Sequence, residues 1–173
     1  MSLIMVDIEA DGPIPGDYSM VTFGAVVVEP SLSKTFYGEL RPISDNWIPE
    51  ALGVGGYTRE QTEKFNDPFD VMTEFRYWIN KNSVGRPEFI SDNNGFDYMF
   101  MHWYFHHFLQ EDPFGHTSRN LNDLYKGLMG NMKKRFKHLR KTKHDHNPVN
   151  DAKSNVEALL KMHEMGLSNL DIE

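Results

Sequence analysis

The stretch Leu3-Ile4-Met5-Val6-Asp7-Ile8-Glu9 begins as an apolar run and ends on two acids separated by one residue. Its alternation after Val6 is typical of a β-strand, in which residues two positions apart point to the same face of a sheet. Asp7 and Glu9 are therefore expected to project together. Two carboxylates on one face repel each other unless a cation lies between them or one is protonated. A strand end with two solvated acids is the alternative for this pattern alone.

The segments that follow predict an α/β domain. A β-branched run and a segment after the Pro30-Ser31 turn predict two more strands, which form an antiparallel meander with the first. Helices and one short strand follow. The expected elements are strands at 3–9, 21–28, 34–40 and 88–91, and helices at 69–80, about 95–109, 121–129 and from Asn147-Pro148 to before Gly166. Strands near the front with helices behind them indicate one domain over residues 1–173, with a mixed sheet flanked by helices.

Two of these helices carry an apolar stripe that is expected to face the core. The stripe of the 69–80 helix consists of Phe69, Met72, Phe75 or Arg76, and Ile79. The stripe of the last helix consists of Ala152, Val156, Leu159, Leu160 and His163. The last helix also has a clear start, with Asn147 as its cap and Pro148 in its first position.

The composition excludes several classes of protein. The 173 residues include no cysteine, which excludes disulfides and thiolate metal sites, so any metal must be held by Asp, Glu, His or backbone oxygen. The densest apolar stretch, Val21–Val28, is too short to cross a bilayer, and the N-terminus lacks the basic start of a signal peptide. We expect a cytoplasmic protein that has no membrane partner.

Charge is distributed unevenly along the chain. Residues 131–145 carry seven basic side chains and one acid, a net charge of +6, which leaves −13 for the remainder of a chain whose total is −7. An acidic body with one basic segment suits a protein that holds cations in one place and a polyanion beside it. The alternative is a solvated basic loop.

Two further acids follow predicted structure that leads to the same edge of the sheet. Asp97 lies in the first turn of the 95–109 helix, directly after a short strand, and Asp151 lies in the first turn of the last helix. His146, just before the cap of that helix, adds an imidazole, a side chain that exchanges protons near neutral pH. Each of these acids alone is also explained by the favourable field at a helix N-terminus.

Together these patterns resemble the DEDDh exonucleases of the DnaQ-like family, which have an RNase H-like fold. The matching pieces are Val6-Asp7-Ile8-Glu9, Asn93-Asn94-Gly95-Phe96-Asp97, and His146 with Asp151 five residues later. Gly56-Tyr57-Thr58 resembles the Gly-Ile-Thr that opens a helix between the first two motifs of the family. A sister group has tyrosine four residues before the last acid, where this chain has Asn147. The resemblance extends over nearly the whole chain and implies a mostly five-stranded sheet.

The resemblance also implies the chemistry. Asp7, Glu9, Asp97 and Asp151 would hold two Mg²⁺ or Mn²⁺ ions, and His146 would act as the general base. The expected activity is 3′-to-5′ removal of nucleoside 5′-monophosphates from single-stranded nucleic acid. A homodimer is plausible from the family alone.

Residues that bind the nucleic acid are less well defined. The candidates are Ala10, Asp11, Tyr57, Asn93, Lys133, Lys134 and Lys137. Ala10 and Asp11 stand where family members commonly have threonine, and Gly55 stands where a histidine usually precedes Gly-Ile-Thr. These departures concern the grip on the 3′-terminal nucleotide more than the chemistry.

Three alternatives remain at this point. RNA is slightly favoured over DNA, because similar small stand-alone members often trim RNA; a proofreading subunit acting on DNA is the second reading. A non-catalytic nucleic-acid or protein-binding module on the same fold is the third, although no acid of the motif is lost. His102 and His106 also have a spacing that suits zinc, but no third ligand is evident nearby and their aromatic neighbours suggest packing.

Overall fold

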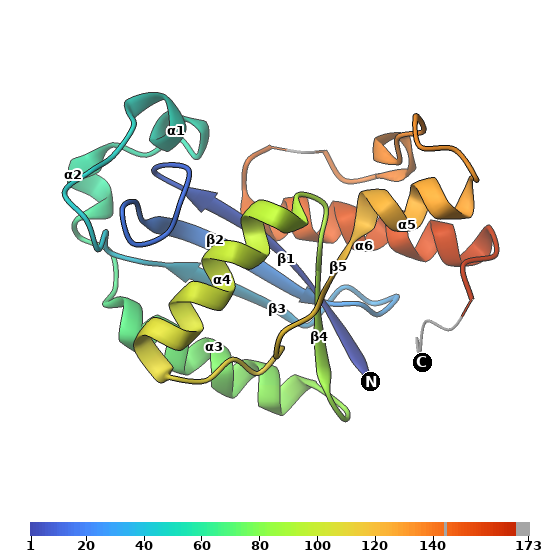
Figure 1. The fold of residues 1–173 in the computed structure, drawn as a ribbon, viewed down its shortest axis with the longest axis horizontal. Coiled ribbons are helices and arrows are strands. Elements are labelled where there is room, and N and C mark those ends of the chain that lie inside the picture. Colours follow the sequence, from blue (N-terminus) through green and yellow to red (C-terminus); the bar gives the residue numbers. More distant parts are fainter. Residues whose placement is uncertain (144, 169–173) are drawn as a thin grey trace.

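The computed structural model describes residues 1–143 and 145–168, and its centre is a five-stranded mixed sheet (Figure 1). The spatial order of the strands is β3-β2-β1-β4-β5. Strands β1 (Ser2–Ala10), β2 (Met20–Val27) and β3 (Thr35–Glu39) form the predicted antiparallel meander. Strands β4 (Pro87–Ser91) and β5 (Ser118–Asn120) extend the sheet in parallel from β1.

The sheet lies between two groups of helices (Figure 1). Helices α3 (Pro68–Asn82) and α4 (Asn94–Leu109) cover one face. Helices α5 (Leu121–Leu128) and α6 (Pro148–Glu164) cover the other, together with the short 3-10 helix η1 (Lys137–Leu139). Helices α1 (Pro49–Val54) and α2 (Arg59–Thr62) lie beyond the C-terminal end of β1. No helix among the described residues is long and apolar enough to cross a membrane.

Alternation along β1 divides the core in two. Ile4, Val6 and Ile8 belong to the cluster beneath α3 and α4, which is rich in phenylalanine. Leu3 and Met5 belong to the cluster beneath α5 and α6. Since Asp7 and Glu9 continue the odd-numbered series, their side chains project on the side of the sheet that α6 covers.

Two predicted stripe positions are wrong. Phe69 is 51% exposed, because the Asp67 cap and Pro68 start α3 in a phase that buries Pro68, Val71, Met72, Phe75 and Ile79 instead. The last helix was expected to bury His163. In the structure His163 is exposed, and the neighbouring Met162 is buried in the core instead. Both errors are shifts of one residue, which rotate a helical position by about 100°.

Other elements were not located by the sequence patterns. Strand β5 is only three residues long, Ser-Arg-Asn, and its sequence has none of the β-branched or aromatic residues that mark strands. Helix α1 and the η1 turn were also not predicted, since each is too short for a periodic signal. Thr58 does open a helix as expected, and its side chain and that of Gln61 form a reciprocal cap on α2.

One glycine allows α6 to approach the sheet. Gly24 of β2 pairs with Asp7 of β1, and a Cβ atom placed on it would lie 2.3 Å from both the carbonyl carbon of Pro148 and the amide nitrogen of Val149. Those are backbone atoms of the first turn of α6, which cannot move aside as a flexible side chain would. A side chain at position 24 would therefore push the start of α6, with Asp151, away from Asp7.

We expect Gly24→Ala to lower the free energy of unfolding by about 1–3 kcal/mol, the usual cost of an extra methyl group in a filled interior. The matched control is Gly53→Ala in α1, where an added Cβ has no atom within 4 Å. Denaturant unfolding of the two variants checks this. A Gly24→Ala protein as stable as the wild type would contradict the close approach.

Candidate active site

The first two acids occupy the end of β1. Asp7 lies opposite Gly24 and Glu9 opposite Thr22 in the antiparallel pairing with β2, and the register shifts between Glu9 and Ala10. Asp7 is 9% exposed, whereas the Glu9 side chain is 18% exposed. The expected projection of the two carboxylates on one face is confirmed by this register. The bulge after Glu9 ends the regular pairing where the chain turns away from the site.

The other two acids come from helix N-termini. Asp97 lies in the first turn of α4 and is 2% exposed, while Asp151 lies in the first turn of α6 and is fully buried. The predicted cap of α6 is confirmed, since Asn147 Oδ1 accepts hydrogen bonds from the amides of Val149 and Asn150. The partial positive charge at each N-terminus favours a carboxylate there. The ends of β1 and β4 and the starts of α4 and α6 meet at one edge of the sheet (Figure 1).

His146 reaches this edge from the loop before α6. Its Nδ1 lies 3.8 Å from Glu9 Oε1, and its side chain is 49% exposed. Glu9, His146 and Asp151 each offer one ligand atom within 4.8 Å of the others. The φ angle of His146 is +61°, which is uncommon for a residue other than glycine and occurs more often at functional sites. The structure thus brings together all five residues that the motifs singled out.

Burial and mutual repulsion raise the pKa values of Asp7, Glu9 and Asp97. Burial raises the pKa of Asp7 well above its ordinary value, and the charges of Asp97, Asp92, Asp151 and Glu9 raise it further. Burial also raises the pKa of Asp97, and the charges of Asp92 and Glu9 raise it further. Burial raises the pKa of Glu9 to about 7, although His146 lowers it.

The donor set fits hard divalent cations. Four carboxylates offer the oxygen ligands that Mg²⁺ and Mn²⁺ prefer, and a cation among them would relieve the repulsion that raises their pKa values. Oδ2 of Asp97 is buried and accepts no hydrogen bond from the described residues, so this oxygen has a lone pair available for a ligand. Such an orphaned buried oxygen is costly unless something binds it.

A network behind the acids was not predicted as part of the site. Asp92 follows β4 directly, and its carboxylate binds Arg140 at 2.8 Å and accepts a hydrogen bond from Asn155. Arg140 also donates to Asn155 Oδ1, which links the loop before His146 to α6. Asp92 directly precedes the motif Asn93-Asn94-Gly95-Phe96-Asp97, whereas its partner Arg140 lies 48 positions further along the chain. No local pattern reveals that pairing.

Two of the expected substrate-binding residues are packed inside the protein. Asp11 is fully buried, with Oδ1 accepting from the amide of Ser19 and Oδ2 pairing with Arg59. Ala10 is 9% exposed at the bulge. Asp11 thus ties the end of β1 to the start of β2 and to α2. A direct contact of either residue with a nucleotide stays a prediction.

Tyr57 and Asn93 are more exposed than Ala10 and Asp11. Tyr57 is half-buried, packs edge-on against Phe65 and shares a hydrogen bond with the hydroxyl of Tyr37. A Cβ placed on Gly55 would lie 3.2 Å from the ring of Tyr57 and 3.9 Å from Cβ of Glu9, so Tyr57 is one residue removed from the acids. Asn93 is exposed at the N-cap of α4, where its carbonyl accepts from the amide of Asp97.

Most of the basic segment lies along α6, away from the acids, and its last residue, Asp145, contacts Asp151. Phe136 is buried in the core cluster of α5 and α6, and Arg140 lies over its ring. The amides of Lys141 and Thr142 donate to Glu157, so this part lies about two turns along α6 from Asp151. Lys133, Lys134 and Lys137 are exposed, and only the end of the segment reaches the site.

Sequence comparison agrees with this geometry. The profile of the exonuclease family RNase_T matches residues 4–159. The chain belongs to this exonuclease family. It is also 40% identical over 131 residues to the 3′-5′ DNA exonuclease Cap18 of Escherichia coli, an alignment that covers 72% of this chain and 68% of that protein. These matches confirm the predicted DnaQ-like family and the predicted class of enzyme, a 3′-5′ exonuclease.

Solved structures share the fold. The nuclease domain of 3′hExo, a DEDDh family member bound to rAMP, aligns with a TM-score of 0.77 at 15% identity over 96% of this chain and 93% of that chain. Cell-death related nuclease 4 (CRN-4) aligns at 0.76 and 16% identity over 95% and 64% of the chains. The E. coli ExoI-ssDNA complex aligns at 0.72 and 16% identity over 96% and 41%. The chain thus spans less than two thirds of the CRN-4 and ExoI chains. These likenesses confirm the predicted RNase H-like fold.

The raised pKa values predict that the metal-free protein loses stability as the pH rises. The folded state raises the pKa of Glu9 from 4.5 to about 7, so proton binding stabilises the fold. This contribution is fully present below about pH 4.5 and is lost as the pH rises through about 7; the raised pKa values of Asp7 and Asp97 act in the same direction. Denaturant unfolding in EDTA across this window measures it.

Glu9→Gln is the control for this pH dependence. Its amide does not titrate, so the fall in the free energy of unfolding between pH 4.5 and 7 becomes shallower than in the wild type. Wild-type stability that increases over the same window, or identical slopes for the two proteins, would show that Glu9 is not held in a proton-binding environment.

Proposed function

We propose that this chain is a divalent-cation-dependent exonuclease that removes nucleoside 5′-monophosphates from the 3′ end of single-stranded DNA. The observation that carries the proposal is the convergence of Asp7, Glu9, Asp97 and Asp151 with His146 at one edge of the sheet. Family membership and this constellation point to the same reaction, hydrolysis of a phosphodiester bond.

The preference for DNA rests on the similarity to Cap18, and not on the length of this chain. The slight preference for RNA that the sequence predicts rests on the resemblance to small stand-alone nucleases. Cap18, at 40% identity, is named as a DNA exonuclease, and E. coli ExoI is described in complex with single-stranded DNA, whereas 3′hExo is described with rAMP. We therefore favour DNA and treat RNA as an outcome of the test.

The four carboxylates would hold the cations. Asp7 is central, because the charges of Asp97, Asp92, Asp151 and Glu9 all raise its pKa. A divalent cation bound there supplies Lewis-acid activation of water and neutralises charge at the phosphate. Asp97 would contribute through its unpaired Oδ2. Asp151 is held by the amide of Asp145, which donates to its Oδ1.

His146 is placed to move the proton. Its imidazole stands at the rim of the carboxylates, exposed enough to meet water and within 3.8 Å of Glu9. It would take the proton of the water that attacks the terminal phosphate, and the leaving 3′-oxygen would stay on the shortened strand. The hydrogen bond of the Asp145 amide to Asp151 fixes the residue directly before His146 and so limits the positions of the ring.

A homodimer, a cytoplasmic location and a role as a proofreading subunit stay predictions. The non-catalytic alternative requires a damaged site, whereas all five motif residues are present and converge.

The decisive experiment follows end-labelled DNA and RNA strands of one sequence in Mn²⁺ and in EDTA. We expect a ladder that shortens from the 3′ end, faster on DNA and absent in EDTA. Asp97→Asn and Asp151→Asn should reduce the rate to the EDTA level. His146→Ala should slow turnover by about 10²- to 10⁴-fold, the usual share of a positioned base.

Each result has a clear reading. No shortening of either strand by the wild type in Mn²⁺ would refute the activity, and a faster RNA ladder would reverse the substrate preference. A His146→Ala enzyme with full rate across neutral pH would remove His146 from the role of base. Circular dichroism of each variant shows whether lost activity reflects lost structure.

The basic segment predicts a salt-dependent grip on the strand. Replacing Lys133 and Lys137 with Glu should weaken binding of a single-stranded oligonucleotide and reduce the dependence of affinity on salt, because fewer counterions are released. The matched control reverses charge at Lys64 and Lys81, which are exposed lysines outside the segment. Fluorescence anisotropy over a range of salt concentrations measures both. Equal affinities for the two double variants would mean that this segment is a solvated loop.

A further inference from the structure

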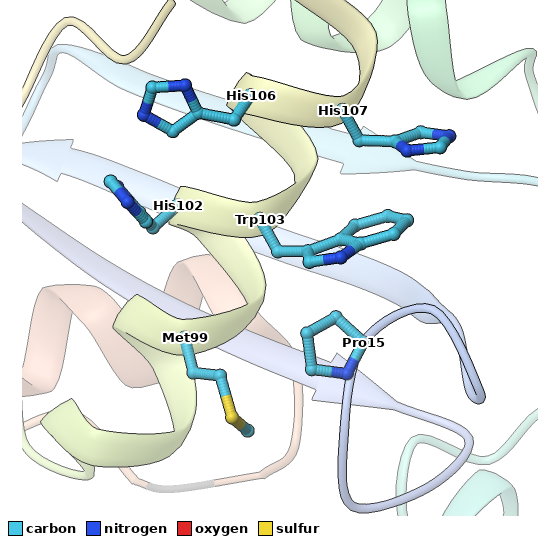
Figure 2. A pocket seen from close by; sticks show the side chains of 6 residues that line it. All are labelled: Pro15, Met99, His102, Trp103, His106 and His107. Atoms are coloured by element: carbon cyan, nitrogen blue, oxygen red, sulfur yellow. The ribbon is translucent and has the colours of Figure 1, made fainter.

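Helix α4 carries a second cluster of metal-binding side chains. His102, His106 and Asp112 each offer one ligand atom within 4.8 Å of the others. The two imidazoles are four residues apart on one helix, and their ring centroids lie 4.5 Å apart. Figure 2 shows both rings on one side of α4, with Trp103 and His107 projecting on the other side. The third ligand, which the sequence pattern did not show, comes from the loop after the helix.

Asp112 is an unusual carboxylate in this loop. Its side chain is 1% exposed, and its Oδ2 lies 2.6 Å from Nδ1 of His102. Its Oδ1 accepts from the amide of Phe114, so the residue is fixed in place. Within residues 1–143 and 145–168, the one ion pair of Asp112 is with His102, which is charged only when protonated. A buried carboxylate is costly unless it is paired, and a cation bound beside Asp112 would offset that cost.

This cluster is separate from the acidic edge. His102 and His106 follow Asp97 by five and nine positions on α4, which places them roughly 140° and 180° around the helix axis from it. Along the axis the separation is about 7–14 Å. The two imidazoles thus face away from the side of α4 that carries Asp97, and one ion cannot contact both sets of ligands.

We propose that His102, His106 and Asp112 bind a divalent transition-metal ion, with Zn²⁺ as the best match to two imidazoles and one carboxylate. Zn²⁺ binds nitrogen and oxygen at about 2.0–2.2 Å in a tetrahedral arrangement, so its ligand atoms lie roughly 3.3 Å apart. Small side-chain rotations bring the present cluster to that spacing. The ion would lie between Nδ1 of His102 and Oδ2 of Asp112, and a neutral His102 ring that binds it through Nδ1 carries its single proton on Nε2. Mg²⁺, which prefers a shell of six oxygens, does not compete.

The surroundings supply a fourth ligand and an entrance. The ring of His116 lies 6.2 Å from that of His102 and is exposed, so a rotation can bring it to the ion. A cavity of about 600 Å³ opens beside the two imidazoles, lined by Pro15, Met99, His102, Trp103, His106 and His107 (Figure 2). A bound ion would add to the link between α4 and residues 112–116, which is now made by the contact of Asp112 with His102, the hydrogen bond from Tyr98 to Gly115 and the packing of Phe114 on Phe105.

The test counts zinc ions by competition with a chromophoric chelator, in excess Mg²⁺ so that the acidic edge is already supplied. His106→Ala removes an exposed ligand whose ring contacts the ring of His102, so folding should be preserved. His107→Ala is the matched control, an adjacent histidine that stacks on Trp103 instead. We expect wild type and His107→Ala to bind one zinc ion more than His106→Ala and Asp112→Asn, and to gain thermal stability with zinc that His106→Ala does not gain.

A second readout separates this site from the acids. Co²⁺ should give the visible absorption of a tetrahedral site in wild type and in Asp7→Asn, but not in His106→Ala, while the nuclease rate of His106→Ala in Mg²⁺ stays that of the wild type. Equal numbers of zinc ions in wild type, His106→Ala and His107→Ala would overturn the proposal. So would a Co²⁺ spectrum that disappears in Asp7→Asn, since the ion would then belong to the acidic edge.

Discussion

The mutual repulsion of buried carboxylates is the constraint on which the rest of this structure depends. Asp7, Asp97 and Asp151 are each at least nine-tenths buried, and Glu9 lies beside them. Bringing these charges together without water costs free energy, which shows as raised pKa values of Asp7, Glu9 and Asp97. A protein keeps such an arrangement only when a rigid frame enforces it, and cations or protons relieve it on binding. The same repulsion between carboxylates favours the binding of divalent cations at this site.

Common structural features hold the four acids together at this edge of the sheet. The alternation of β1 aims two acids at one face, and two helix N-termini supply fields that favour the other two. Gly24 allows the first turn of α6 to lie against β2, which places Asp151 beside Asp7. Behind the acids, Asp92, Arg140 and Asn155 connect the end of β4, the loop before His146 and α6. The pairing of β1 with β2, the approach of α6 to Gly24 and the bond from Asn155 to Asp92 join parts of the chain that are far apart in sequence.

Helix α4 presents two kinds of donor on opposite sides. Its first turn contributes a hard carboxylate oxygen at the edge of the sheet, and its later turns carry imidazoles that face a loop and a cavity. The helix is apolar nearly all round and has aromatic residues at many positions, so the sequence shows no single core face. That is why the aromatic neighbours of His102 and His106 favoured a packing interpretation. In the fold, Phe100, Tyr104 and Phe105 are buried, whereas both histidines turn away from the core.

The sequence by itself determined the meander of the first three strands and the starts and ends of the long helices, because alternation and capping are local. It also singled out the five candidate site residues through short motifs. It misplaced Phe69 and His163 by a single helical position and missed β5, since neither phase nor pairing is set by local preference. Only the tertiary structure decided that Asp11 is engaged by Ser19 and Arg59, that Arg140 of the basic segment is held by Asp92, and that Asp112 meets His102. Those outcomes depend on which distant segments pack together, and packing is a property of the whole chain rather than of any stretch of it.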